Sequence, residues 1–324
     1  MLPARRVSRA ARTAAAIFCA SLIGCGQPAP RPLRIGLLVW PGFEPAYLAR
    51  QRGYLDSAAV QLVDYTSASD MTRAMNNGQI DALALTFVSG IQLASTDSSI
   101  RAIMVLDVSN GADAVLGAAD VTTIRALKGR PVAISPSGGS AYLVSRALEA
   151  AGMTLDDVIK VRMDEANTEE ALRSGRVAAV MAYEPQRSRM LQHSAHQLFS
   201  SADVKGEIAD VLLARASTVV ERREALRGFM TAWYRAVDDL HAQREATSAL
   251  LAAREHVSAA DFRAMLDLLE IPGPGEARAL LADSTSAFFR SGRRFARMMR
   301  DEGVLRRDVD VAHVIDASLL GGAP

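Results

Sequence analysis

The chain is poor in cysteine, with only Cys19 and Cys25 among its 324 residues. Both lie near the start, so residues 26–324 hold no thiol for a disulfide bond, a redox pair or a thiolate-bound metal. This absence excludes from that part of the chain the scaffolds and enzymes whose chemistry depends on cysteine.

An excess of charge of one sign and long apolar runs are also missing. The 37 Lys and Arg residues balance 36 Asp and Glu residues, which excludes the strongly basic surface typical of nucleic-acid binding. After Leu33 no apolar run is long enough for a transmembrane helix. About 290 residues remain there, enough for two lobes with their own cores.

The start of the chain predicts an export signal. The apolar run at 14–23 is too short to span a bilayer comfortably, and the basic residues that precede it are Arg5, Arg6, Arg9 and Arg12. Residues 22–25, Leu-Ile-Gly-Cys, match the bacterial lipobox, in which the cysteine is diacylated and becomes the new N-terminus. A plain secretory signal with a chance cysteine is the alternative. Twin-arginine export lacks its expected apolar context.

We therefore expect a lipoprotein signal peptide at 1–24, lipidation of Cys25 and a tether at 25–32. The tether is polar and proline-rich, so it is expected to be semi-extended and to hold the folded body near a membrane. A second lipid on the amine would make the anchoring stable, because one acyl chain binds only marginally.

Short apolar, β-rich runs alternate with helical patterns from Leu33 to about Arg215. This alternation predicts α/β layers around a largely parallel sheet. The expected strands are 33–39, 60–65, 80–85, 100–106, 131–135, 158–163, 177–183 and 210–215.

The pattern occurs twice, offset by 97 positions. Residues 77–82, Asn-Gly-Gln-Ile-Asp-Ala, align with residues 174–179, Ser-Gly-Arg-Val-Ala-Ala, and in each a helix ends at glycine before a buried strand. The same offset pairs Leu62 with Ile159, Ile35 with Val132, and Asp70 with Asn167, the last two being candidate helix N-caps. The repeat predicts two lobes of related topology.

Beyond Arg215 the pattern becomes helical. Apolar residues recur at three- and four-residue spacing over 226–240, 262–269 and 288–299, and Pro-Gly-Pro-Gly at 272–275 breaks the series. Trp233 and the other aromatic residues of these stripes are expected in the core.

The repeat also selects four loops that could bind a ligand, because ligands of parallel α/β lobes lie at the carboxyl ends of strands. Two lobes that face each other would bring all four loops around one cleft. The candidate binding residues in these loops are Trp40, Gly42, Thr86, Ser137, Gly138, Gly139, Ser140, Tyr183 and Glu184.

Each loop has a plausible chemistry and a simpler alternative. The helix start at 137–140 could hold an anionic group, or be an ordinary N-cap. Trp40 could stack on a planar ligand, or plug its lobe. Glu184, held extended by Pro185, could pair with an ammonium or amidine N–H, or cap the surface. The polar segment 107–113 is expected to be a hinge crossing, which makes Ser109 and Asp113 second-tier candidates.

Motifs for catalysis are missing. The chain has no Gly-x-Ser-x-Gly and no phosphate-binding Gly-x-x-x-x-Gly-Lys, and its one His pair at helical spacing is His193 and His196. No carboxylate lies beside that pair, so a chance pair is favoured over a metal site. We therefore expect no catalytic residue, no metal and no cofactor.

Taken in order, these segments resemble the substrate-binding proteins of ABC importers in the nitrate, sulfonate, taurine and thiamine-precursor group. The likeness covers essentially everything after Leu33. It rests on residues 35–42, 44–50, 53–54, 77–82, 107–113, 127–133 and 183–185.

The resemblance implies a type II periplasmic-binding-protein fold. Two α/β lobes would be joined by two crossover strands, the second near residues 209–215, with C-terminal helices packed on lobe one. The expected division is 33–110 for the first part of lobe one, 111–212 for lobe two and 213–324 for the return to lobe one. Relatives usually have Trp-Glu-Pro where this chain has Tyr183-Glu184-Pro185, which alters one aromatic wall.

The resemblance also implies a function. We expect a monomeric, extracytoplasmic protein that captures a small anionic or zwitterionic solute, sulfonate-like or pyrimidine-precursor-like, by hinge closure and delivers it to an ABC permease and ATPase. An enzyme of the pyrimidine-synthase type on the same fold is one alternative, although the Cys-rich iron motif of that branch is absent. A ligand sensor that feeds a signalling protein is the other.

Overall fold

The segments with alternating strand and helix patterns form two separate sheets. The structure is a computed structural model, and it describes residues 31–136, 138–303, 305 and 307–320. The expected signal peptide and Cys25 lie outside these residues. The first sheet contains, in spatial order, β11 (Leu269–Glu270), β4 (Ile100–Ser109), β10 (Ala209–Arg215), β3 (Ala82–Thr86), β1 (Leu33–Leu38) and β2 (Val60–Tyr65). The order of the second is β7 (Ile159–Arg162), β6 (Pro131–Ile134), β8 (Ala179–Tyr183), β5 (Asp113–Gly117) and β9 (His196–Ser200).

The two sheets have the same internal plan. In the first, β2, β1 and β3 run parallel and β10 pairs antiparallel with β3. In the second, β7, β6 and β8 run parallel and β5 pairs antiparallel with β8. The pair Ile35–Ala82 in the first sheet has its counterpart in Val132–Ala179, at the expected offset of 97.

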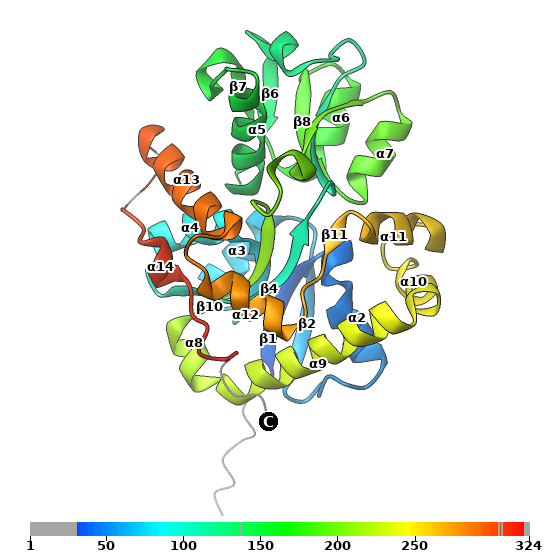
Figure 1. Cartoon of the computed structure of the whole chain (residues 1–324), viewed down its shortest axis with the longest axis vertical. Helices are drawn as coiled ribbons and strands as arrows, with labels where there is room; N and C mark the ends of the chain where they lie inside the picture. Colours follow the sequence, from blue (N-terminus) through cyan, green and yellow to red (C-terminus); the bar gives the residue numbers. More distant parts are fainter. Residues whose placement is uncertain (1–30, 137, 304, 306, 321–324) are drawn as a thin grey trace, which may run out of the picture. The chain divides into compact units, whose positions relative to one another are not determined.

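Two segments connect the sheets, and together with the sheets they give the expected type II arrangement of two lobes (Figure 1). The chain leaves β4 of the first sheet and enters β5 of the second through residues 110–112. It returns from β9 to β10 through η6 (Ser201–Val204). The lobe boundary expected at residue 212 therefore falls inside β10, a strand of the first sheet.

Hydroxyl groups join the two connecting segments. Ser109 Oγ lies 2.8 Å from Ser201 Oγ, and Ser201 Oγ also accepts the backbone N–H of Gly111 at 2.7 Å. Gly111 has a φ of 118°, a region that L side chains rarely adopt, so glycine is needed at this turn. Ser109 was a candidate ligand contact; the structure places it here, at the hinge.

Helices cover both sheets (Figure 1). In the first half of the chain they are α2 (Glu44–Gln51), α3 (Ala68–Asn76), α4 (Phe87–Thr96), α5 (Gly138–Ala150), α6 (Thr168–Arg173) and α7 (Gln186–Gln192), with one-turn helices η2 (Pro41–Phe43), η3 (Ile124–Leu127), η4 (Leu155–Asp157) and η5 (Glu165–Asn167). After β10 follow α8 (Ala216–Glu221), α9 (Arg223–Ala242), α10 (Arg244–Leu251), α11 (Ala259–Leu266), α12 (Pro274–Ala282), α13 (Ala287–Asp301) and α14 (Val311–Val314). None of the helices in the described residues is both long and apolar enough to cross a membrane.

The C-terminal helices pack on the first lobe, as expected. α9 lies against α2, α12 against β4, and α13 and α14 against α4. Their apolar stripes account for this packing, and Trp233 is fully buried.

Helix α13 also reaches the second lobe. Phe295 contacts Tyr142 of α5 edge to face, with ring centroids 6.1 Å apart. At the end of α13, Glu302 accepts a hydrogen bond from Lys160 at 2.9 Å. One helix thus holds both lobes, which sequence periodicity alone could not reveal.

The strand pairing, three strands and one helix start differ from expectation. Both sheets are mixed instead of largely parallel, because the crossing strands and their neighbours pair antiparallel. The short strands β5, β9 and β11 were not recognised, because β5 directly follows the polar hinge segment and β9 carries polar residues at both ends. α3 begins at Ala68, and its N-cap is Ser67, whose side chain accepts the N–H of Asp70. Asp70 is therefore not the cap that its position suggested.

Candidate ligand-binding site

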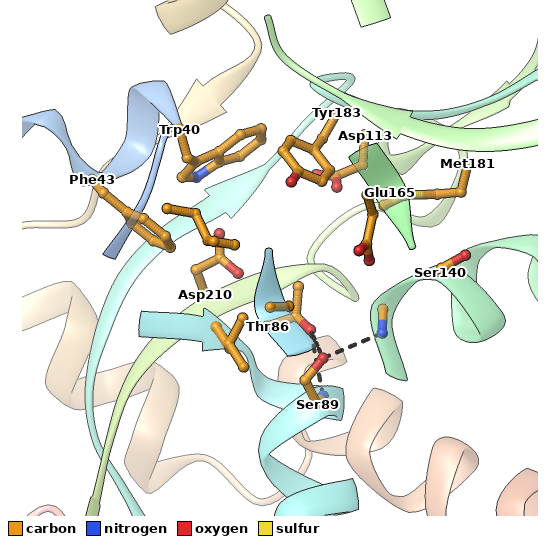
Figure 2. Close-up of a pocket in the computed structure, with 14 residues that line it drawn as sticks. Trp40, Phe43, Thr86, Ser89, Asp113, Ser140, Glu165, Met181, Tyr183 and Asp210 are labelled. Carbon is orange, nitrogen blue, oxygen red and sulfur yellow. Dashed lines mark hydrogen bonds between the residues drawn. The ribbon is translucent and has the colours of Figure 1, made fainter. Parts of the chain in front are cut away.

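A small cavity of about 60 Å³ lies where strand ends of the two lobes meet (Figure 2). Thr86 ends β3 of the first lobe and Tyr183 ends β8 of the second, so equivalent positions of the repeat face the same space. The lining residues are Leu38, Trp40, Phe43, Ala68, Leu85, Thr86, Ser89, Asp113, Gly139, Ser140, Glu165, Met181, Tyr183 and Asp210.

Six of the expected binding residues line this cavity and four do not. The six are Trp40, Thr86, Asp113, Gly139, Ser140 and Tyr183. Those placed elsewhere are Gly42, Ser109, Gly138 and Glu184, while Ser137 lies outside the described residues.

Aromatic rings form one wall of the cavity. Trp40 and Tyr183 meet edge to face, with centroids 5.8 Å apart and an interplanar angle of 83°, and Phe43 adds a third ring beside them (Figure 2). Trp40 comes from the first lobe and Tyr183 from the second. The wall is thus assembled across the lobes and must part if they separate.

A buried carboxylate fixes the position of the Trp40 ring. The indole Nε1 donates a hydrogen bond to Asp107 Oδ2 at 3.0 Å. Gly42 permits this pair, because a Cβ at Gly42 would lie 2.1 Å from the same oxygen and 2.4 Å from the indole nitrogen. Gly42 was expected as a ligand contact, and its observed role is to leave room for the Trp40–Asp107 pair.

The start of α5 is already hydrogen-bonded within the protein. The N–H of Gly139 donates to Ser89 Oγ of the other lobe at 3.3 Å, and Ser140 Oγ accepts the N–H of Ser135 at 3.1 Å. Ser89 is in turn held by Thr86, the N-cap of α4, at 2.7 Å between hydroxyl oxygens (Figure 2). A protein hydroxyl therefore accepts one N–H of the helix start that was expected to hold an anionic ligand group.

Gly138 allows close packing at the start of α5. A Cβ at this position would lie 2.7 Å from the ring of Phe295 and 3.1 Å from the carbonyl oxygen of Val88. The glycine lets α13 and the first lobe come close to the start of α5.

Carboxyl groups give the cavity its electrostatic character. Asp113, Glu165 and Asp210 line it from three different elements (Figure 2), and Asp107 is hydrogen-bonded to the indole of Trp40. Burial raises the pKa of Asp107 to about 8, partly offset by the hydrogen bond from Trp40. Burial also raises the pKa of Asp113 to about 6 and that of Asp210 well above its ordinary value, with repulsion from neighbouring acids adding to both shifts.

Glu184 turns away from the cavity, contrary to expectation. Its carboxylate accepts hydrogen bonds from Arg187 Nη1 at 2.7 Å, from Ser188 Oγ at 3.0 Å and from the Ser188 N–H at 3.1 Å. The side chain is fully buried. It satisfies the first turn of α7 and has no free oxygen to offer a ligand.

Sequence reasoning missed Phe43, Glu165 and Asp210. The repeat contained a signal for two of them, because the offset of 97 takes Ala68 to Glu165 and Asp113 to Asp210. Phe43 had no such signal. The sequence pattern predicts Asp210 only as the start of a crossing strand, because its burial depends on packing between distant segments.

The residues around the cavity offer carboxyl, hydroxyl and aromatic groups. No lysine, arginine, histidine or cysteine is among those that line it. Within the described part of the chain there is also no group of His, Cys, Asp and Glu residues arranged to hold a metal ion. The arrangement is that of a small cavity between two lobes.

Comparison with solved structures supports this fold assignment. The alkanesulfonate-binding protein SsuA from Xanthomonas axonopodis pv. citri, bound to MOPS, superposes with a TM-score of 0.73 at 18% identity, covering 89% of this chain and 99% of its own. The nitrate-binding protein NrtA from Synechocystis PCC 6803 gives 0.69 at 15% identity, with 90% and 88% covered. The desulfurization enzyme DSZB gives 0.62 at 15% identity, with 90% and 98% covered.

No curated protein matches the chain. A family profile does: the one described as NMT1/THI5 like matches residues 40–247, which is more than half of the chain and includes most of the cavity residues. The chain therefore belongs to the NMT1/THI5-like family.

Proposed function

We propose that this protein is the extracytoplasmic solute-binding component of an ABC importer, and that it captures a small polar solute and delivers it to a permease. The observation that carries the proposal is the cavity between equivalent strand ends of two lobes joined by two crossing segments. Proteins named for sulfonate and nitrate binding share this fold.

Capture works by hinge closure. Apart from the crossing segments, a few polar and aromatic contacts hold the lobes together near the cavity, including Ser89–Gly139 and Trp40–Tyr183. Ser69 Oγ adds a hydrogen bond to Asp164 across the lobes at 2.8 Å. A solute that replaces these contacts with stronger ones shifts the population toward the closed form.

The protein works at a membrane surface as a monomer, held by lipid on Cys25 after removal of residues 1–24. This part of the proposal rests on the lipobox and the proline-rich tether, because the segment lies outside the described residues. A permease and an ATPase are the partners that an importer requires.

Tryptophan fluorescence tests the capture step. The chain has two tryptophans, Trp40 in the cavity wall and Trp233 in the core of the first lobe, so a bound solute changes the emission of Trp40. The purified protein is titrated with sulfonates, thiamine precursors, nitrate, bicarbonate and small amines, with X-ray scattering to detect closure. Trp40→Phe should abolish the fluorescence change. Absence of both binding and closure with every solute would refute the proposal.

A catalytic role on the same fold is the second candidate, because DSZB, a desulfurization enzyme, has a similar structure. Binding and turnover are separated by analysing the solute after prolonged incubation with the protein. An importer component returns it unchanged, whereas an enzyme leaves a product whose amount grows with time.

A further inference from the structure

Asp113 and Asp210 face the cavity from equivalent positions in the two lobes. Asp113 opens β5 and pairs with Tyr183 of β8, while Asp210 lies in β10 and pairs with Thr86 of β3. The offset of 97 that relates the lobes takes Asp113 to Asp210 and Thr86 to Tyr183, so each pair joins equivalent positions. The closed site therefore has a carboxyl group at the same place on each side.

Asp210 is buried without a partner. Its exposed fraction is 8%, and its carboxylate forms no hydrogen bond or ion pair with any residue in the described ranges. A buried carboxylate without a partner is costly, because desolvation is not repaid by any interaction. The side chain lines the cavity, so a bound solute is the natural source of that partner.

The surroundings of the two acids make an uncompensated negative charge still less favourable. On β4, Asp107 pairs directly with Asp210, and its buried Oδ1 has no hydrogen-bond partner. Asp113 lies near Glu184, whose negative charge is countered by Arg187. Burial raises the pKa of Tyr183 in the aromatic wall, and the negative charges of Glu165 and Glu255 lie close enough to raise it further. No cation lines the cavity itself.

The described residues that line the cavity include no positively charged side chain for an anionic group. The N–H of Gly139 at the α5 start donates to Ser89. Glu165 lies beside Ser140 of the same helix (Figure 2), and Ser135 Oγ donates a hydrogen bond to its carboxylate. A sulfonate or nitrate placed in the cavity would meet carboxyl oxygens and aromatic rings without a compensating positive charge.

We infer that the solute is a small organic cation, an amine, amidine or protonated aminoheterocycle, that bridges Asp113 and Asp210 beside the rings of Trp40 and Tyr183. This inference rests on the proposed binding function and replaces the anionic or zwitterionic solute that the sequence suggested. The cation supplies hydrogen-bond donors to both carboxylates, and aromatic faces attract positive charge. At pH values at which both groups are ionised, repulsion between the two carboxylates favours opening, and the cation reverses it.

Probes of equal shape and different charge test whether the site prefers a positively charged solute. Acetamidine, acetamide and acetate form one series, and benzamidine, benzamide and benzoate form a larger one. With Trp40 fluorescence as readout, the amidinium of at least one series should bind at least 100-fold more tightly than its neutral and anionic counterparts. Tighter binding of the carboxylates, or of ethanesulfonate in a parallel titration, would overturn the inference.

Proton linkage provides an independent readout. The raised pKa values mean that Asp210, and below about pH 6 also Asp113, carry protons in the empty protein, and a bound cation lowers those pKa values. Calorimetry of benzamidine or acetamidine binding in phosphate and in Tris should therefore show proton release, with affinity rising from pH 5 to pH 8. Proton uptake on binding would contradict the inference.

Variants locate the contact. Asp113→Asn and Asp210→Asn keep the shape of the side chains and should each weaken amidine binding at least 10-fold, while the exposed control Asp156→Asn should leave it unchanged. Thermal unfolding verifies that each variant is folded. If an anion binds and closes the lobes, the inference fails and the importer proposal survives. If no probe binds and no closure is seen, both fail.

Discussion

The indole of Trp40 and the carboxylate of Asp107 form a buried hydrogen bond of 3.0 Å that joins the loop after β1 to the crossing strand β4. The aromatic wall is therefore positioned by an acid that has no contact with solvent. Asp107 also pairs with Asp210 in the sheet. One residue of the crossing strand thus contacts the aromatic wall and lies beside an acidic residue of the cavity.

Stability should fall as pH rises because of Asp107. Its pKa is raised to about 8, so the folded protein keeps a proton that the unfolded chain releases near pH 4. Stability from this group is complete at low pH and is lost between about pH 4 and pH 8, at up to about 1.4 kcal/mol per pH unit. In urea unfolding, the free energy of unfolding of Asp107→Asn should fall less steeply with pH than that of the wild type. The difference in slope should correspond to at most one proton. Equal slopes would contradict this assignment, and Asp156→Asn serves as the control.

A methyl group at Gly42 should disrupt the same pair. In Gly42→Ala the new Cβ would overlap both Asp107 and Trp40, so one of them must move, at a cost of about 1–3 kcal/mol. We expect a changed Trp40 emission spectrum and loss of the solute-induced signal. Gly228→Ala, at an exposed helical site with nothing within 4 Å, should instead stabilise the protein by about 0.5–1 kcal/mol. An unchanged spectrum in Gly42→Ala would show that the pair tolerates the methyl group.

Glu184 should matter for stability and little for binding. Glu184→Ala leaves Arg187 without its buried partner, which costs about 3–5 kcal/mol in comparable pairs. Chemical denaturation measures this loss, and titration under folding conditions should give a solute affinity within about twofold of the wild type. Glu170→Ala removes an exposed ion pair with Arg173 and should cost at most about 1 kcal/mol. A large loss of solute affinity without a loss of stability would show that Glu184 contributes to solute binding.

Helix α13 should control the balance between open and closed forms. Phe295→Leu weakens contacts with Tyr142 of the second lobe, whereas Phe288→Leu weakens a stack on Phe87 within the first lobe at 4.1 Å between centroids. Both substitutions reduce core packing by a similar amount. Only Phe295→Leu should increase the radius of gyration of the solute-free protein in X-ray scattering. Equal radii for the two variants would mean that α13 does not hold the lobes together.

Cys25 should determine membrane attachment. We expect the wild-type protein in the membrane fraction, with an acyl label. The Cys25→Ala variant should be exported with an uncleaved or differently cleaved leader and should carry no acyl label. Metabolic labelling with a palmitate analogue measures this directly, and Cys19→Ala is the matched control. Equal labelling of both variants would exclude Cys25 as the lipid site.

The sequence by itself determined the duplicated α/β plan, because strand and helix patterns follow from local residue types and the repeat is written at a constant offset. It also placed Trp40, Thr86 and Tyr183 at one cavity, since parallel strands of each lobe end at the same edge. Only the tertiary structure decided which polar groups face that cavity. Glu184 is turned aside by Arg187, and Asp210 is buried by strands that are distant in sequence, because burial and pairing of charges depend on packing that no local pattern specifies.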